Sequence, residues 1–163
     1  VSRTAPIVPL IHGGSQQRLR SGSLDAAGVF AAGLAAEIAT ADIDGKAARL
    51  TALRDRLANG ILEAVPTATI RGHLTNRSPG NVHVTIPGLD SVSALFLLDE
   101  AGHAVSAGSA CQAGVQSSSH VLRAMGVDAS EGPLRFTLGL TNSEGEIDAV
   151  LKLLPSIVAR TTH

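Results

Sequence analysis

Cys111, the only cysteine among 163 residues, is the side chain best suited to nucleophilic chemistry. A free cysteine is often a small buried hydrophobe, and the thiol considered alone favours that structural role. The neighbours of Cys111 favour a different role, because the stretch from Ser106 to Gly114 contains only small or polar side chains. Gly108 and Gly114 also leave the backbone free to move. The setting indicates a nucleophile carried on a mobile segment.

Arg135 is the second candidate, since a guanidinium offers a fork of donors that matches a carboxylate. The stretch 134–140 alternates between apolar and other residues, as a half-buried strand does. Arg135 therefore points away from the apolar face of that strand, which consists of Leu134, Phe136, Leu138 and Leu140. Strand geometry alone favours a solvated or salt-bridged surface arginine, whereas the fork suits recognition of an amino-acid substrate.

A third candidate is the segment 12–23, which reads His-Gly-Gly-Ser-Gln-Gln-Arg-Leu-Arg-Ser-Gly-Ser. Its glycines, hydroxyls and two arginines suit an oxyanion such as phosphate. Ser23 also precedes a predicted helix, and the first amides of a helix are unpaired donors that bind anions. A role for Ser23 as a simple helix cap is equally compatible with the sequence.

The six histidines do not form a metal-binding pattern. No His-x-x-x-His pair and no second cysteine are present, so the sequence predicts no metal site. A nucleophilic pair of Cys111 with His103 or His120 stays open, because such partners need to be close only in space.

The composition predicts one packed globular domain, with 44% hydrophobic and 17% charged residues. Nucleic acid is an unfavourable partner, since the formal net charge is -1 and neither Trp nor Tyr is available for stacking. No membrane partner is expected either, because Glu37 interrupts the apolar stretch 26–36 well before membrane-spanning length. One cysteine permits no internal disulfide and favours a reducing compartment, so we expect a cytoplasmic location.

The pattern along the chain predicts three regions. Residues 1–23 are expected to form an extended arm, and residues 24–65 a long helix that is broken near Asp42 and ended by Pro66. Residues 66–163 are expected to form a small α/β domain, in which helices cover a mixed sheet. Its predicted strands are 67–71, 81–86, 103–106 and 134–140, and the second of these alternates Val82, Val84 and Ile86 with His83 and Thr85. Its predicted helices are 91–101, 119–126 and 143–158. Asp90 or Ser91 is expected to cap the first helix, and Ser143 and Glu146 have the spacing of a capping box for the last. Because the chain starts at Val1 and runs directly into Pro-containing sequence, we expect a cleaved or truncated piece of a longer protein.

Several segments in order resemble the carboxy-terminal portion of the cysteine desulfurases, on the branch used in iron-sulfur cluster assembly. These are class V aminotransferases of the fold type I pyridoxal-phosphate enzymes. The segments are His12-Gly13-Gly14, Arg20-Ser21-Gly22-Ser23, Gly108-Ser109-Ala110-Cys111, the run 119–126 and the run 134–139.

The resemblance implies a homodimer in which a large cofactor domain is followed by a small α/β domain. In the family a lysine holds pyridoxal 5'-phosphate as a Schiff base, and a loop cysteine attacks the sulfur of L-cysteine to give alanine and a persulfide. By motif match Cys111 would be the nucleophile, and Arg135 would bind the substrate carboxylate. Ser23 would reach the phosphate of the neighbouring subunit's cofactor. The implied partners are the N-terminal cofactor-domain half and a sulfur-acceptor scaffold protein.

The sequence departs from the family pattern in three places. The family's Ser-His-Lys motif has no match, and Lys46 and Lys152, the only lysines, lie in surface-patterned helical segments. We therefore expect this chain to be inactive without an N-terminal half. The arm is one residue shorter than usual, with Ser15 and Gln17 where glycine and glutamate are common, and Ser23 replaces a threonine but keeps the hydroxyl.

Two further readings stay open at this point. The missing lysine also fits a non-catalytic persulfide carrier or protein-binding module that docks on another protein. The same fold also fits a selenocysteine lyase-like relative.

Overall fold

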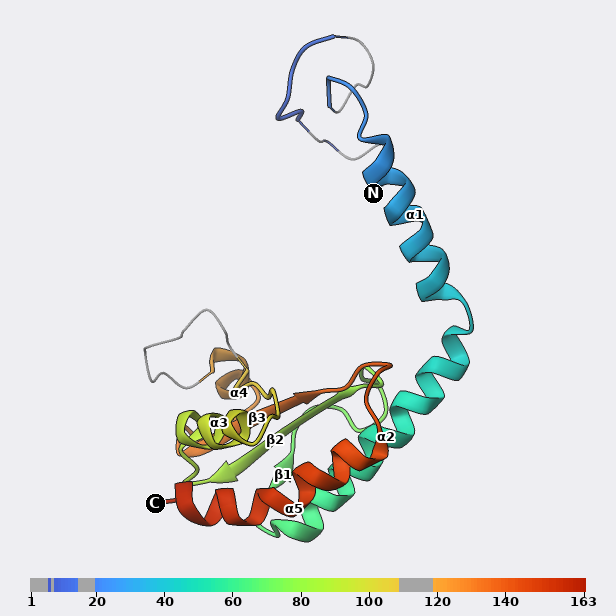
Figure 1. Ribbon diagram of the computed structural model, residues 1–163. Coiled ribbons are helices and arrows are strands. Elements are labelled where there is room, and N and C mark those ends of the chain that lie inside the picture. Colours follow the sequence, from blue (N-terminus) through green and yellow to red (C-terminus); the bar gives the residue numbers. More distant parts are fainter. Residues whose placement is uncertain (1–5, 7, 15–19, 109–118) are drawn as a thin grey trace. The chain divides into compact units, whose positions relative to one another are not determined.

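The computed structural model describes residues 6, 8–14, 20–108 and 119–163 of the chain (Figure 1). These residues belong to two compact units, 1–43 and 44–163. The division predicted at residues 23 and 65 concerns the relation to a larger enzyme and stays a prediction.

The first unit contains helix α1 (Ala26–Thr40), which buries none of its residues. Asp25 caps the helix, because its carboxylate accepts a hydrogen bond of 2.9 Å from the backbone amide of Gly28. The helix ends at Ala41, and Asp42 follows in the left-handed region with a φ of 51°. The predicted break near Asp42 is confirmed.

Helix α2 (Ile43–Ala64) brings one apolar stripe into the second unit. Leu53, Leu57 and Ile61 recur at a spacing of four residues, so they lie on one face, and all three are buried. Gly60 permits close packing on α5, since a Cβ there would lie 2.4 Å from Leu151. The helix stops two residues before Pro66, as predicted.

Three strands form the sheet of the second unit: β1 (Thr69–Ile70), β2 (Asn81–Pro87) and β3 (Glu131–Thr137). Their order is β1-β2-β3, and both neighbouring pairs are antiparallel. The α/β class is confirmed. The prediction of a mixed sheet is wrong for the residues described here, because β2 pairs antiparallel with both neighbours.

The predicted strand at 103–106 is also wrong. The amide of His103 donates to Leu98 O and so still belongs to the end of the preceding helix, while only Ser106 pairs with β3, as an isolated bridge to Arg135. The predicted strand at 134–140 begins three residues earlier and ends at Thr137. Gly132 permits the close approach of this part of β3 to Leu89, because a Cβ there would lie 2.1 Å from the carbonyl oxygen of Leu89.

The described residues of this unit form three further helices: α3 (Ser91–Glu100), α4 (His120–Ala124) and α5 (Glu144–Thr161). Asp90 caps α3 through the amides of Val92 and Ser93. Ser143 and Glu146 form the predicted capping box of α5. Side-chain caps therefore set the starts of α3 and α5.

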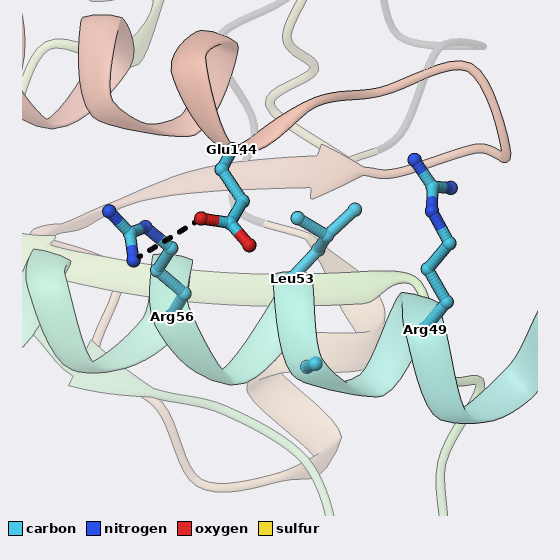
Figure 2. A pocket seen from close by; sticks show the side chains of 5 residues that line it. Arg49, Leu53, Arg56 and Glu144 are labelled. Carbon is cyan, nitrogen blue, oxygen red and sulfur yellow. Dashed lines mark ion pairs between the residues drawn. The ribbon is translucent and has the colours of Figure 1, made fainter.

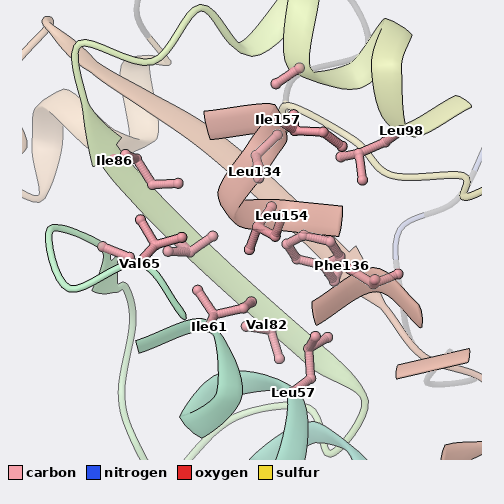
Figure 3. Close-up of a cluster of buried hydrophobic side chains, with 14 of the residues drawn as sticks. Leu57, Ile61, Val65, Val82, Ile86, Leu98, Leu134, Phe136, Leu154 and Ile157 are labelled. Atoms are coloured by element: carbon pink, nitrogen blue, oxygen red, sulfur yellow. The ribbon is translucent and has the colours of Figure 1, made fainter. Parts of the chain in front are cut away.

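The core lies on one face of the sheet, between β2, β3 and the helices α2, α3 and α5 (Figure 3). Every second residue of β2 and β3 faces it, as strand geometry requires. The strands contribute Val82, Val84, Ile86, Leu134 and Phe136, and the helices contribute Leu57, Ile61, Leu98, Leu154 and Ile157.

Within the ranges that the structure describes, no single helix is both long and apolar enough to cross a membrane. Only α1 and α2 counted together reach that length and composition, with a break between them.

The packing of α5 on the sheet predicts a large effect of truncation at its centre. Leu154 is fully buried, so Leu154→Ala should lower the free energy of unfolding by about 2–5 kcal/mol. Urea denaturation measures this change. Leu62→Ala is the matched control, because that side chain is 41% exposed and its loss should cost less than about 1 kcal/mol. Equal losses in the two variants would contradict the described core.

Candidate functional site

Arg135 lies at the centre of β3, on the face of the sheet opposite the core, and is half-buried. Its backbone exchanges two hydrogen bonds with Ser106. Its side chain donates to the carbonyl of Gly108 at 3.2 Å and to the hydroxyl of Ser106 at 3.4 Å. Both bonds are long for a guanidinium. No carboxylate within the described ranges forms an ion pair with Arg135, so its charge is available to a ligand.

The same contacts anchor the chain that leads toward Cys111. The amide of Gly108 donates to the hydroxyl of Ser106 at 3.1 Å, and the carbonyl of Gly108 accepts from Arg135. Cys111 itself lies outside the described residues, so its role as nucleophile stays a prediction. The structure thus places Arg135 in contact with Gly108, three residues before Cys111 in the sequence.

His83 of β2 stands directly opposite Arg135 in the register of the sheet. Burial is the main cause that lowers the pKa of His83 from its ordinary value, followed by the positive charges of Arg135, Arg77 and Arg71. Both causes disfavour the protonated form of the imidazole. Its Nε2 is buried and has no hydrogen-bond partner among the described residues.

A network of Arg71, Thr85 and Glu131 ties the three strands together on this face. Arg71 donates to the Thr85 hydroxyl at 2.7 Å and pairs with the Glu131 carboxylate, to which Thr85 also donates. These bonds from Thr85 and then Arg71 lower the pKa of Glu131. The only carboxylate in this network is thus already engaged.

Arg77 adds a further cation near this face. Burial, followed by the charge of Arg54, lowers the pKa of Arg77, and its Nε atom is buried without a partner in the described chain. Arg54 itself pairs with Asp55. Arg135 and Arg77 therefore leave the face with an excess of positive charge, which suits an anionic ligand.

Ser23 lies in the first unit, and its side chain is exposed. The helix-cap alternative is wrong, because Asp25 performs that function for α1. Arg20 donates to the backbone carbonyl of Ser23 at 2.8 Å, while the hydroxyl of Ser23 has no hydrogen bond within the described residues. An unpaired hydroxyl beside a guanidinium fits a phosphate ligand. The predicted contact with the cofactor phosphate stays a prediction.

Neither lysine has the setting of a Schiff-base residue. Lys46 lies on α2 and is partly exposed, and Lys152 lies on the exposed side of α5. The side chains of this chain thus fit a contact to the phosphate of pyridoxal 5'-phosphate, but they do not fit its covalent attachment.

The two histidines proposed as partners of Cys111 lie in different settings. His103 is half-buried near the start of α5, where its charge contributes to the lowered pKa of Glu146, after the hydrogen bonds from Ser143. His120 is exposed and is the first residue of α4. Within the described ranges no group of three or more His, Cys, Asp or Glu residues could hold a metal ion.

A shallow pocket of about 270 Å³ lies between α2 and the start of α5 (Figure 2). Its polar side chains are already engaged: Arg56 pairs with Glu144 and Asp148, and Arg49 donates to the carbonyls of Leu140 and Asn142. Arg135 does not line it. We interpret this pocket as part of the packing contact between α2 and α5, which these ion pairs stabilise.

The fold and the face of the sheet that carries Arg135 define the class of protein: a small α/β domain whose sheet has an apolar face and a cationic face. The family model "Aminotransferase class-V" matches residues 10–150. The chain belongs to this family.

Individual similar proteins give a more specific match than the family model. The chain is 45% identical to an "IscS-like cysteine desulfurase" of Mycobacterium tuberculosis over 97% of its own length and 41% of that protein. It is 40% identical to a "Cysteine desulfurase" of Gluconacetobacter diazotrophicus over 98% of its length and 41% of that protein. A solved "NIFS-LIKE PROTEIN" superposes with a TM-score of 0.79 at 33% identity, again over 98% of this chain and 41% of that one. The chain thus spans about two fifths of the proteins that it matches.

The network around Glu131 predicts a specific acid sensitivity. A carboxylate with a lowered pKa stabilises the fold above its unfolded pKa, and this stability is lost as the pH falls through the lowered value. Thr85→Val removes the main cause of the shift, so the free energy of unfolding should fall at a higher pH than in the wild type. Urea denaturation over an acid pH series measures this. Thr137→Val, an exposed site on β3, is the control and should keep the wild-type profile; identical profiles for Thr85→Val and wild type would contradict the assignment.

Proposed function

We propose that this chain is the C-terminal part of a pyridoxal-phosphate-dependent cysteine desulfurase. In this proposal the enzyme converts L-cysteine to alanine and carries the sulfur as a persulfide on Cys111, for iron-sulfur cluster or other thio-cofactor assembly. The observation that carries it is Arg135, a half-buried guanidinium without a carboxylate partner in the described chain, in contact with Gly108, three residues before Cys111 in the sequence. The names of the similar proteins support the same activity.

Arg135 would bind the carboxylate of the substrate cysteine. Its bonds to Gly108 and Ser106 are 3.2 and 3.4 Å long and involve neutral acceptors. A carboxylate would offer shorter, charge-assisted bonds in a two-point geometry, which are roughly twice as strong. Binding of the carboxylate would fix the orientation of the substrate, and therefore of its side chain, relative to the sheet.

Cys111 would act as a thiolate, because the thiolate is the nucleophilic form and nearby cations lower the pKa of a thiol. Its sulfur would form a bond to the substrate sulfur while the carbon–sulfur bond of the substrate breaks. The electron pair of that bond, with a proton, remains on the substrate carbon and gives alanine, and the persulfide remains on Cys111. When bound, pyridoxal 5'-phosphate supplies the electron sink for this cleavage.

The remaining parts of the enzyme belong to the same proposal. A lysine of an N-terminal half would hold the cofactor, so this chain alone would be inactive. Ser23 would contact the cofactor phosphate of a neighbouring subunit in a homodimer, a sulfur-acceptor scaffold protein would receive the persulfide, and the enzyme would work in the cytoplasm.

The first test uses this chain joined to, or reconstituted with, a lysine-bearing N-terminal half. Supplied with cysteine and no added reductant, the assembled enzyme should form alanine, and mass spectrometry should find Cys111 heavier by one sulfur atom. With an added dithiol reductant such as dithiothreitol, which reduces the persulfide, alanine and sulfide should form in equal amounts. Cys111→Ser should abolish sulfide release, because the hydroxyl is a far weaker nucleophile. This chain alone serves as the control and should release none. Full sulfide release by Cys111→Ser would refute the proposed role.

A second test concerns the substrate carboxylate. Arg135→Ala should raise KM for cysteine by roughly 10- to 100-fold, the size expected for loss of a hydrogen-bonded ion pair. Arg135→Lys is the matched control, because it keeps the charge and loses the fork, and it should recover only part of the affinity. Steady-state alanine formation measures both. A KM unchanged in Arg135→Ala would remove Arg135 from substrate binding.

A further inference from the structure

His83 and Arg135 form a close cross-strand pair. The amide and carbonyl of Arg135 bond to Ser106, on the side away from β2, and the carbonyl of His83 accepts from the amide of Arg71 at 2.7 Å, on the side away from β3. Residues 83 and 135 are therefore a non-hydrogen-bonded pair of the β2–β3 ladder. Such pairs have Cβ atoms about 4.5–5.5 Å apart and share one face of the sheet. The two side chains stand side by side on the face opposite the core.

The charges around His83 are predominantly positive. Arg135 comes from β3, Arg71 follows β1, and Arg77 lies in the loop before β2. Glu131, a carboxylate of β3 on the same face, is engaged by Arg71 and Thr85. Both burial and these arginines oppose protonation of the ring. A neutral imidazole has one N–H and one lone pair.

The buried Nε2 of His83 is the atom that this arrangement leaves unused. It has no partner among the described residues, and an unsatisfied buried polar atom costs free energy. Of its surroundings, the arginine side chains supply donors only. Arg135 has five N–H groups and uses two nitrogens, on the neutral oxygens of Gly108 and Ser106. In the tautomer that carries its proton on Nδ1, Nε2 is thus an acceptor without a donor, on the residue that pairs across the ladder with a donor of unused capacity.

We propose that His83 is a positioning residue for Arg135: its neutral Nε2 accepts a hydrogen bond from the guanidinium when Arg135 turns from Gly108 and Ser106 to grip the substrate carboxylate. The inference rests on the proposed function and adds to it a residue that sets substrate affinity. In this state His83 fixes one edge of the guanidinium, and the other edge presents its fork to the ligand. Protonation of His83 removes the lone pair and places a like charge beside Arg135, so affinity for the carboxylate falls.

The main experiment measures KM and kcat for cysteine in the assembled, lysine-bearing enzyme over a pH series. His83→Phe fills the space without an acceptor, so it should raise KM roughly tenfold while kcat changes little. His83→Gln places an amide oxygen near the position of Nε2 and should restore a KM close to that of the wild type. In the wild type KM should rise as the pH falls through the lowered pKa of His83, and in His83→Gln this rise should disappear. Thr137→Ala, on the same face, controls for general effects of surface substitution and should behave as the wild type.

A second measurement separates this inference from the proposed function. Nitrogen NMR of the histidine rings in this chain should show the pKa of His83 rising in Arg135→Gln, which removes the neighbouring charge. An unchanged pKa would overturn the pairing whatever the enzyme does, as would equal KM values for His83→Phe and His83→Gln. If the pKa rises but the wild-type enzyme releases no sulfide, the desulfurase assignment fails and the pairing of His83 with Arg135 stands.

Discussion

The alternation of side chains along β2 and β3 is the constraint on which the rest of the structure depends. One residue in two faces the helices, and the next faces the opposite side of the sheet. Val82 and Val84 are therefore buried, while His83 between them in the sequence is directed away from the core. In the same way, Leu134 and Phe136 are buried and Arg135 between them is directed away from the core. The apolar core and the cationic face are formed by the same two strands, so the packing of one fixes the spacing of the other.

The cationic face is stabilised by the ion pair of Arg71 with Glu131, and this pair does not involve Arg135 or His83. Arg71 and Glu131 are each about four-fifths buried, with side-chain exposures of 22% and 18%, and Thr85 joins them across the strands. This network engages Oε2 of Glu131 with two donors at one end of β3. Arg135 and His83, four pairs further along the ladder than Glu131, are left to interact with residues 106–108 and with a ligand. Separation along the strand keeps the structural carboxylate from neutralising the candidate binding group.

Local signals made much of the fold predictable. The break near Asp42, the caps at Asp90 and Ser143 and the alternation in β2 are encoded within a few residues, and all are confirmed. Nonlocal features were missed. The close approach of Gly132 to the backbone of Leu89 joins segments far apart in the sequence, and the pairing of His83 with Arg135 depends on strand register. Neither is encoded in a local pattern. The alternation around His83 did carry a signal for its face, and only the identity of its neighbour was hidden. Ser23 was a plausible cap by residue type, but Asp25 has the spacing to Gly28.

Helix α1 exposes apolar side chains to solvent and is not part of the core of the second unit. Its exposed side chains include Val29, Phe30, Leu34 and Ile38, with exposures of 67%, 74%, 47% and 61%, so apolar surface faces water along the whole helix. Residues 44–163 enclose their own core and do not need that helix for it. A contiguous apolar surface promotes self-association at high concentration. We therefore expect α1, whose 15 residues contribute nothing to the core of the second unit, to promote self-association of this chain in concentrated preparations.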